Sequence, residues 1–196
     1  MRPPVLIAFG SNIDPLENLE RGLKQLHERI PIEALSSVWR TPPLPNPNPQ
    51  GAPPALDPVS EGDNSLSERG PADFLNGALL CRSDLPPLPL RQLLREIEAA
   101  CHRQRRPDRY APRTLDLDIA LMGRQVLRAE KLILPDPDIP SRPFLALPLA
   151  ELAGEMIHPL EGCTLSELAA RFGPEPVDMT LDQKATKRLR AIVSHR

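Results

Sequence analysis

The sequence predicts an α+β fold, in which helices flank a mainly antiparallel central sheet in a ferredoxin-like two-layer or three-layer α/β sandwich. Three observations lead to this prediction. Short apolar segments with strand character mix with amphipathic helical segments, but strict βαβ alternation is not kept. The chain has 196 residues, enough for one domain with a sizeable core. Its 26 prolines cluster where the predicted elements end.

The first elements are a strand and a helix. Residues 5–9 form a short apolar strand that ends at the turn 10–12. The helix that follows takes Asp14 as its N-cap and Pro15 in its first turn, and Glu17 completes a capping-box pattern. Its apolar residues recur at spacings of three and four, so one face is expected to pack on the sheet: Leu16, Leu19, Leu23, Leu26 and Ile30.

The next segment contains two strands separated by a long insertion. Residues 34–41 are predicted to form a strand that stops at Pro42-Pro43, and residues 74–81 form another. Residues 45–73 hold seven prolines and almost no large apolar residue, so we expect a mobile loop. A domain linker is the alternative, but too few residues precede it to form a domain.

The second half of the chain begins with an amphipathic helix. Its apolar face consists of Leu90, Leu93, Leu94, Ile97 and Cys101. An arginine-rich loop, 102–112, leads into a strand that a turn at Gly123-Arg124 joins to residues 125–127 as a hairpin. Further predicted elements are a short strand at 132–134 and helices at 143–153 and 164–172. We assign residues 1–173 to one domain and 174–196 to a tail that holds one extra helix, with an apolar side formed by Leu181, Ala185, Leu189 and Ile192.

The segment 113–121, RTLDLDIAL, carries the strongest chemical signal. Side chains of a strand alternate between its faces, so Asp116 and Asp118 project to one side. Carboxylates at this spacing, ~6.6 Å, repel by ~2.5 kcal/mol at an effective dielectric of about 20, and a divalent cation between them reverses this cost. Mg²⁺ prefers carboxylate and phosphate oxygens. The opposite face is expected to point into the core, with Leu115, Leu117, Ile119 and Leu121.

Five arginines just upstream would suit a polyphosphate: Arg103, Arg105, Arg106, Arg109 and Arg113. They favour a metal–phosphate site over the alternative, an edge strand with a solvated acidic face.

Charge and composition exclude several classes of protein. The formal net charge of −2 argues against a general nucleic-acid binder, which is usually basic. The three cysteines, Cys81, Cys101 and Cys163, are scattered and odd in number, as is typical of reduced thiols in the cytosol. No signal peptide and no run of membrane-spanning length is visible. We expect a cytoplasmic monomer with no nucleic-acid or membrane partner.

Several segments together resemble the 6-hydroxymethyl-7,8-dihydropterin pyrophosphokinase family of folate biosynthesis. The resemblance covers roughly residues 4–170, interrupted by the 45–73 loop, and the RTLDLDI block is its most specific part. The segments are Gly10-Ser11-Asn12, Arg40-Thr41-Pro42-Pro43-Leu44, Phe74-Leu75-Asn76, Arg113-Thr114-Leu115-Asp116-Leu117-Asp118, Arg142-Pro143-Phe144 and Pro148-Leu149-Ala150-Glu151.

The resemblance implies transfer of a pyrophosphoryl group from ATP to the hydroxymethyl oxygen of the pterin, with release of AMP. Asp116 and Asp118 would hold two Mg²⁺ ions, and Arg103 and Arg113 match the catalytic arginines of the family. Such chemistry needs positioning and charge neutralisation rather than a covalent intermediate. Residues on the ATP side would be Glu98, Arg105, Tyr110, Arg113, Thr114, Ile119, Lys131 and Arg142.

The pterin side is also implied by the resemblance. A flat bicyclic ring requires an apolar slot with convergent hydrogen bonds, and Asn76 offers both a donor and an acceptor. Residues 10–12 would form a turn that lines this side. Rings and backbone groups that wall the slot would come from Thr41, Pro42, Pro43, Leu44, Phe74 and Phe144.

The sequence departs from the family at Asp136, where a phosphate-contacting histidine is usual. An anion there is expected to weaken ATP binding unless Lys131 or Arg142 neutralises it, and Arg95 could offset the change. Asp136 therefore supports an alternative function, in which the protein descends from this family and binds nucleotide or pterin without turnover. A nucleotidyltransferase with Gly10-Ser11 and the two aspartates is a second alternative, although about a hundred residues separate these elements. An RNA-binding protein ranks last.

Overall fold

An antiparallel sheet of six strands forms the centre of the protein in the computed structural model, which describes residues 2–43, 73–103, 111–173, 176 and 178–194. Most of the predicted loop at 45–73 therefore lies outside the described residues. The strands of this sheet are β1 (Pro4–Ser11), β2 (Ile32–Leu35), β3 (Trp39–Thr41), β4 (Phe74–Arg82), β5 (Asp116–Met122) and β8 (Thr180–Leu181). Their order is β5-β1-β4-β3-β8, and β2 pairs with β4 beyond β3.

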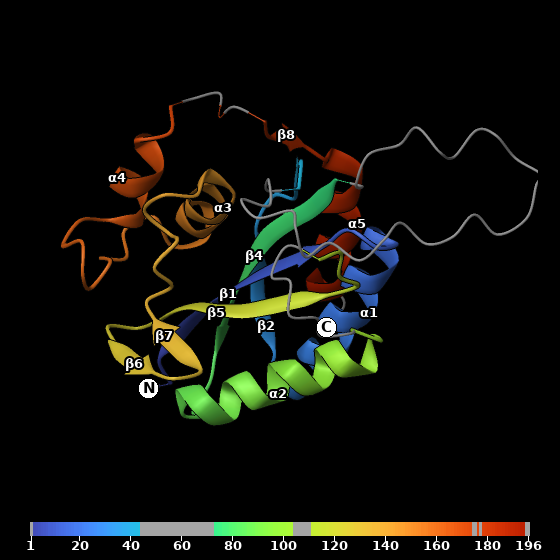
Figure 1. Ribbon diagram of the computed structural model, residues 1–196, viewed down its shortest axis with the longest axis horizontal. Helices are drawn as coiled ribbons and strands as arrows, with labels where there is room; N and C mark the ends of the chain where they lie inside the picture. Colours follow the sequence, from blue (N-terminus) through green and yellow to red (C-terminus); the bar gives the residue numbers. More distant parts are fainter. Residues whose placement is uncertain (1, 44–72, 104–110, 174–175, 177, 195–196) are drawn as a thin grey trace, which may run out of the picture.

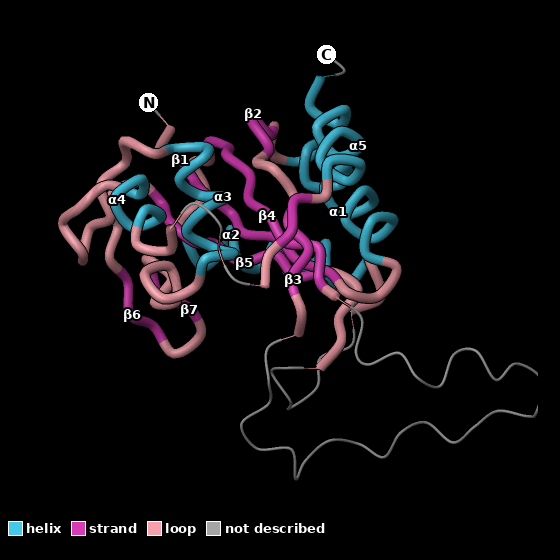
Figure 2. Tube along the Cα trace, turned by 90° about the horizontal axis from the view of Figure 1, so that it is seen from above, coloured by secondary structure: helices cyan, strands magenta, loops and turns pink. Residues whose placement is uncertain are grey.

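Helices cover both faces of the sheet, so the predicted α/β sandwich is confirmed as three layers (Figures 1 and 2). One face carries α1, α2 and α5, and the other carries α3 and α4. If β2 and β3 are taken as one interrupted strand, the chain runs β-α-β-β-α-β, the ferredoxin-like connection. The helices are α1 (Pro15–Arg29), α2 (Pro87–Ala100), α3 (Pro143–Ala153), α4 (Leu165–Ala170) and α5 (Gln183–Ser194).

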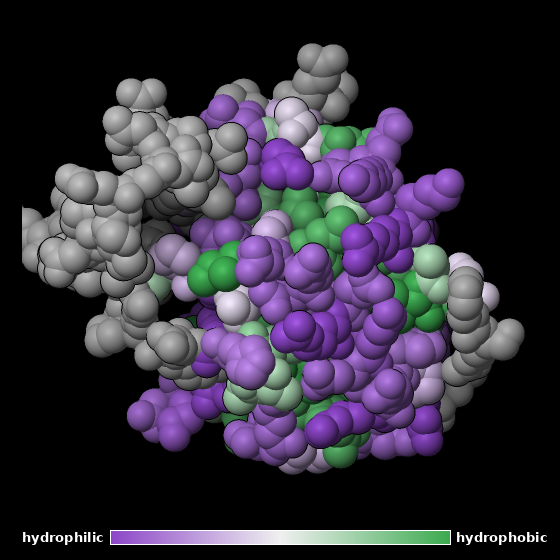
Figure 3. Space-filling model, turned by 90° about the vertical axis from the view of Figure 1, so that its right-hand side faces the viewer, coloured by the Kyte–Doolittle hydropathy of each residue, from purple (hydrophilic) through white to green (hydrophobic). Residues whose placement is uncertain are grey.

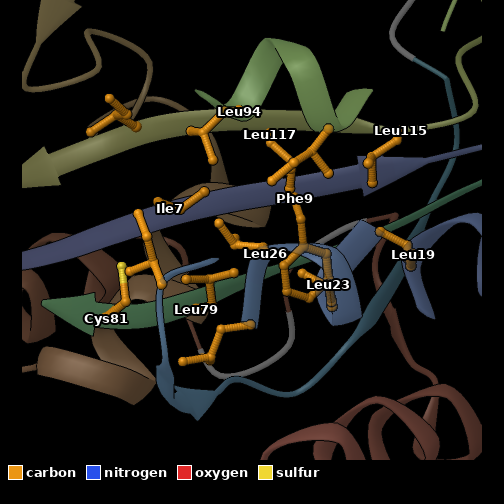
Figure 4. Close-up of a cluster of buried hydrophobic side chains, with 14 of the residues drawn as sticks. Ile7, Phe9, Leu19, Leu23, Leu26, Leu79, Cys81, Leu94, Leu115 and Leu117 are labelled. Carbon is orange, nitrogen blue, oxygen red and sulfur yellow. The ribbon is translucent and has the colours of Figure 1, made fainter. Parts of the chain in front are cut away.

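The larger core fills the space between the sheet and α1 and α2. Figure 4 shows side chains of β1, β4 and β5, among them Phe9 and Leu117, meeting Leu23 and Leu26 of α1. The leucine spacing of α1 correctly predicts this face, because Leu19, Leu23 and Leu26 are fully buried. The smaller core lies on the opposite face, under α3 and α4.

The predicted strand at 34–41 is two strands, because one extra residue interrupts its pairing with β4. Leu35 pairs with Leu79 and Trp39 with Asn76, so this side advances four residues while β4 advances three. Ser36 fills the break: its Oγ accepts a hydrogen bond from the Ala78 N–H at 2.9 Å. A short hydroxyl side chain can replace a ladder partner in this way.

A second irregularity places Leu121 on the other face from the one predicted. Leu6 pairs with Leu121 and Ile7 with Ile119, so Ala120 is an extra residue in β5. The carbonyl of Ala120 accepts a hydrogen bond from the Asp136 N–H at 2.8 Å. Beyond this bulge the alternation is reversed, and Leu121 joins the core under α3. Asp116 and Asp118 precede the bulge and keep the predicted common face.

The predicted N-cap of α1 is confirmed, but its capping box and one predicted hairpin do not form. Asp14 is the N-cap of α1, but its backbone is left-handed (φ 41°) and its side chain makes no capping bond; Asn18 Nδ2 instead donates to the Ile13 carbonyl at 2.7 Å. The hairpin from the Asp116 strand to residues 125–127 does not form. Instead β6 (Leu127–Ala129) pairs with β7 (Leu132–Leu134) in a separate two-stranded sheet. The helix predicted at 164–172 is observed as α4, which starts with a capping box between Thr164 and Glu167.

The C-terminal tail joins the sheet and its α1 face. β8 pairs with β3 at the sheet edge, and α5 packs beside α1 (Figure 2). Ala185 and Leu189 of α5 are buried as predicted, whereas Leu181 belongs to β8 and is 46% exposed. Its position in an edge strand rather than in the helix explains the difference.

The surface beside α1 and α5 is mainly hydrophilic, and hydrophobic atoms show there in small separate spots (Figure 3). An ion pair between Arg188 and Glu20, at 2.6 Å, joins the two helices on this side. Within the described residues, no helix has the length and apolarity needed to cross a membrane.

Candidate active site

A cavity of about 480 Å³ lies on the α3 face of the sheet, where β1 ends and β4 and β5 begin. The loop before α3 and the segment before β8 complete its wall. Ten of the predicted site residues meet here, although they come from distant parts of the sequence. They are Thr41, Pro42, Pro43, Phe74, Asn76, Arg113, Asp116, Asp118, Arg142 and Phe144.

Four predicted ATP-side residues are not among those that line the cavity. Ile119 is 3% exposed and belongs to the core on the α1 and α2 face of the sheet. Lys131 is exposed in the turn between β6 and β7. Glu98 is buried, and Thr114 precedes β5 with its hydroxyl group buried. Their contacts with ATP stay predictions, and three further predicted residues lie outside the described structure: Leu44, Arg105 and Tyr110.

Asp116 and Asp118 both face the cavity, as their alternation in the strand predicts. Asp116 accepts a hydrogen bond from Arg103 on one oxygen and from Arg113 on the other, each at 2.5 Å. Asp118 makes no hydrogen bond or ion pair with a described residue. The two acids therefore differ: guanidinium groups neutralise Asp116, whereas no described residue forms an ion pair with Asp118.

The pKa values of the two acids move in opposite directions. Enclosure by the cavity walls raises the pKa of Asp118 to about 7, with help from the negative charges of Asp116 and Glu98. Enclosure also acts to raise the pKa of Asp116, but Arg103 and Arg113 outweigh it and hold that pKa below its usual value. The surroundings of Asp118 thus favour its neutral form, and a cation beside the carboxyl group would favour the ionised form.

Arg103 is held in place by a buried acid behind the strand. Glu98, at the end of α2, accepts hydrogen bonds from Arg103 and from the Leu117 backbone N–H, the latter at 2.9 Å. The Arg103 N–H also bonds to the Glu98 carbonyl, at 3.1 Å. Glu98 is 2% exposed, so it is not a solvated carboxylate on the helix surface. Glu98 therefore orients Arg103 toward Asp116.

The turn at residues 10–12 fixes the other arginine. Asn12 Oδ1 accepts a hydrogen bond from the Arg113 backbone N–H at 2.8 Å, and Ser11 Oγ donates to the Thr114 carbonyl at 2.6 Å. Both side chains are buried. The predicted lining role holds for Gly10, which borders the cavity, whereas Ser11 and Asn12 anchor the backbone around Arg113. No sequence pattern reveals this second role, because the two segments meet only in the folded sheet.

Thr41, Phe74 and Asn76, which are predicted to bind the pterin, lie on β3 and β4, across β1 from the two acids of β5. Asn76 Nδ2 donates to Thr41 Oγ1 at 2.8 Å, which fixes the amide plane. Gly10 permits this position, because a Cβ on residue 10 would lie 2.5 Å from Asn76 Oδ1. Phe74 lies nearby, with the Arg113 guanidinium 5.7 Å from its ring centroid.

The loop before α3 adds polar groups to the cavity. Asp136 lines it, and enclosure raises the pKa of this acid. Its Oδ1 accepts the Asp138 N–H at 2.8 Å, and no ion pair joins it to Lys131 or Arg142 in the described structure. Arg142 also lines the cavity, and its buried Nε has no hydrogen-bond partner among the described atoms.

Sequence reasoning missed several lining residues. Ala8 carries no chemical signal, and Asp138 and Ser141 stand in a loop whose path depends on β5. Asp178 and Met179 belong to the tail, which the family resemblance does not reach. Only the pairing of β8 with β3 brings them to the cavity.

Comparison with known proteins gives the family. Residues 6–154 match the family model described as 7,8-dihydro-6-hydroxymethylpterin-pyrophosphokinase (HPPK). The 2-amino-4-hydroxy-6-hydroxymethyldihydropteridine pyrophosphokinase of Pseudomonas aeruginosa is 34% identical over 173 residues, which are 85% of this chain and 90% of that protein. The protein of the same name from Synechocystis is 32% identical over 178 residues, 89% of this chain and 76% of that protein.

Solved structures show the same fold. A crystal structure of HPPK-DHPS in complex with substrates superposes with a TM-score of 0.61 at 14% identity, covering 88% of this chain and 44% of that one. Plasmodium falciparum HPPK-DHPS A437G gives a TM-score of 0.58 at 14% identity, with 88% and 43% covered. The chain thus spans less than half the length of these proteins. From the match to the family model and to relatives covered over three quarters or more of their length, the chain belongs to the 7,8-dihydro-6-hydroxymethylpterin-pyrophosphokinase family.

Proposed function

We propose that this protein is an enzyme that transfers the pyrophosphoryl group of ATP to the hydroxymethyl oxygen of 6-hydroxymethyl-7,8-dihydropterin and releases AMP. The relatives named above carry this activity in their names. One observation carries the proposal: a single cavity is lined by acids, guanidinium groups, an amide and aromatic rings, among them Asp116, Asp118, Arg113, Arg142, Asn76, Phe74 and Phe144. These are the groups required by a polyphosphate and by a flat heterocycle.

The two ends of the cavity suit the two substrates. The β5 end holds Asp116 and Asp118, with Arg103 and Arg113 beside them, and would take the triphosphate. The opposite end, on β3 and β4, offers the Asn76 amide, which would read the ring edge. A pterin at that end would direct its hydroxymethyl group along the sheet toward the β-phosphorus. Holding the two reactants in line supplies a large part of the rate.

The acids fit magnesium. They offer oxygen donors, and Asp118 has no competing hydrogen bond or ion pair among the described residues. No group of three or more metal-ligating side chains occurs in the described part of the chain, so phosphate oxygens and water would complete the coordination. The two Mg²⁺ ions expected from the resemblance would supply charge neutralisation at the phosphates when bound.

The arginines would stabilise charge that moves between phosphate oxygens. In the absence of ligands Arg103 and Arg113 share Asp116. Binding of a cation by Asp116 would weaken these pairs and leave both guanidinium groups to phosphate oxygens. Their forked donors suit this exchange better than an ammonium group.

The nucleotidyltransferase alternative loses its second element. Ser11 would have to reach the nucleotide phosphates, but it is fully buried and donates to the backbone around Thr114. The remaining alternative is a protein that binds nucleotide or pterin without turnover. The assay described next distinguishes the pyrophosphokinase, the nucleotidyltransferase and this binding protein.

The test is incubation with ATP, Mg²⁺ and the hydroxymethyl dihydropterin, followed by nucleotide chromatography. AMP together with a pyrophosphorylated pterin supports the proposal, whereas free pyrophosphate with a nucleotidylated product indicates the nucleotidyltransferase. Asp118→Ala should lower the turnover rate at least about 100-fold, since electrostatic contributions of this kind are worth several kcal/mol. The melting temperature should not fall, because the substitution removes a carboxylate without protein partners. Normal AMP release by this variant would refute the metal assignment.

A further inference from the structure

We propose that the C-terminal segment 178–186 shapes the pterin site: the Met179 side chain forms the outer wall of the site, and the backbone pairing of β8 together with the start of α5 holds the strand that carries Thr41. This inference rests on the proposed function for the identity of the ligand. The match to the family model ends at residue 154, so nothing in that match assigns a role to this segment.

The register of β8 places Met179 at the pterin end of the cavity. Leu181 pairs with Trp39 and Thr180 with Arg40, so the next step brings Met179 beside Thr41. Met179 lines the cavity together with Thr41 and Asn76. The acids of β5 lie at the other end of the strand order, across β1 and β4. A methionine side chain is flexible and apolar, and it can pack against the face or edge of a heterocycle.

The same segment supplies hydrogen bonds to the break between β2 and β3. The Asp182 N–H donates to the Val38 carbonyl at 2.8 Å, and Thr186 Oγ1 accepts the Val38 N–H at 2.8 Å. Thr186 is buried, and its hydroxyl group donates in turn to the Asp182 carbonyl. Both backbone groups of Val38 therefore depend on the tail, because β4 does not pair with this residue.

Charged groups strengthen this attachment at β3 and at β2. Arg40 forms an ion pair with Asp182 at 2.7 Å. Further along α5, Arg190 donates to the Leu35 carbonyl at 3.1 Å and pairs with Glu151 of α3 at 2.6 Å. The tail thereby contacts β2, β3 and α3, and β3 ends at the cavity with Thr41 and the two prolines that follow it.

The test compares Met179→Ala with Leu181→Ala. Both variants remove an apolar side chain from the same segment, but Leu181 does not line the cavity. Equilibrium binding of the pterin and of ATP is measured separately, with the fluorescence of Trp39, the one tryptophan of the chain, as a reporter. Met179→Ala should weaken pterin binding by about five- to tenfold. Its dissociation constant for ATP should stay within twofold of that of the unaltered protein. Leu181→Ala should keep both dissociation constants within twofold.

A second pair of variants tests the support of β3. Thr186→Val removes the acceptor for the Val38 N–H at nearly constant volume, and Thr186→Ser keeps it. The valine variant should raise KM for the pterin several-fold more than KM for ATP, and the serine variant should restore it.

The outcomes are distinct. Pterin binding by Met179→Ala that stays within twofold of the unaltered protein overturns the inference, as does an equal loss in Met179→Ala and Leu181→Ala. If Thr186→Val does not fold, the Met179 comparison alone decides. The unaltered protein is assayed for AMP release in parallel, and a failure there refutes the proposed function. The ratio of the pterin dissociation constants of Met179→Ala and Leu181→Ala tests the role of the C-terminal segment separately.

Discussion

Glu98 and Leu117 are joined by a 2.9 Å hydrogen bond from the Leu117 backbone N–H to the Glu98 carboxylate. Leu117 stands between Asp116 and Asp118, so this bond ties α2 to the strand at the point where the two acids face the cavity. The same carboxylate oxygen also holds Arg103. One buried acid thus positions a strand, a guanidinium group and, through them, the acidic pair.

Replacement of Glu98 should therefore impair both stability and catalysis. Glu98→Ala leaves the Leu117 N–H buried without a partner, which costs about 1–3 kcal/mol of unfolding free energy. Misplacement of Arg103 should also lower kcat by about tenfold or more. Glu98→Gln keeps an acceptor for Leu117 and should preserve stability better than activity.

The control for this prediction is Glu96→Ala on the same helix. Glu96 is exposed and pairs with Arg29 at 3.4 Å, so its loss should change the unfolding free energy by less than about 0.5 kcal/mol. Denaturant titration and steady-state kinetics measure both effects. Equal stability and activity of Glu98→Ala and Glu96→Ala would contradict the positioning role.

Gly10→Ala should act on the pterin rather than on the fold. The new Cβ would lie 2.5 Å from Asn76 Oδ1, so the amide must move away from Thr41. We expect KM for the pterin to rise by about tenfold with little change in KM for ATP, because one good hydrogen-bond geometry is lost. In contrast, Gly77→Ala would press on the Phe9 ring in the core and should lower the melting temperature. A Gly10→Ala enzyme with unchanged pterin KM would argue against the ring-reading role of Asn76.

Asp136→Asn should improve ATP binding. Asp136 adds a negative charge to a cavity that already holds Asp116 and Asp118, and no ion pair from a described residue offsets it. Removal of this charge should lower KM for ATP several-fold, most clearly at low salt, where screening is weak. Asp84→Asn, an exposed site paired with Arg2, removes the same charge and should leave KM unchanged. A rise in KM for ATP in Asp136→Asn would instead mean that the carboxylate binds a ligand.

Asp182 should make stability depend on pH through the tail. The Ala185 N–H at the start of α5, and then Arg40, hold the pKa of Asp182 below its ordinary value. A lowered folded-state pKa contributes stability above the unfolded pKa of about 3.9, and this contribution is lost as the pH falls through the folded-state value. Asp182→Ala should cost about 1–2 kcal/mol at pH 7, and less below pH 4.

Asp182→Asn is the matched control, because asparagine keeps the helix cap but loses the charge. It should retain most of the stability at pH 7 and show a flatter pH dependence. Unfolding free energies at pH 7 and pH 3.5 decide the matter. If Asp182→Ala lowers the unfolding free energy by the same amount at pH 7 and at pH 3.5, ionisation of the Asp182 carboxylate is not the cause of the lost stability.

By itself, the sequence determined the fold class, the family and the acidic pair. Local pattern suffices for these: the leucines of α1 repeat at helical spacing, and Asp116 and Asp118 alternate with leucines in a strand. Both properties depend on residues a few positions apart, where backbone geometry alone sets the direction of each side chain. The motif residues Thr41, Asn76 and Phe144 could likewise be assigned to one site by resemblance.

Tertiary structure decided what depends on partners far along the chain. The bulge at Ala120 forms against β1 and the loop at Asp136, so alternation alone put Leu121 on the wrong face. Glu98 became a buried positioning residue because α2 lies against β5, and Met179 reached the cavity because β8 adds to the edge of β3. In each case a backbone group or charge was satisfied by a residue that only folding brings near, and local periodicity carries no information about such a partner.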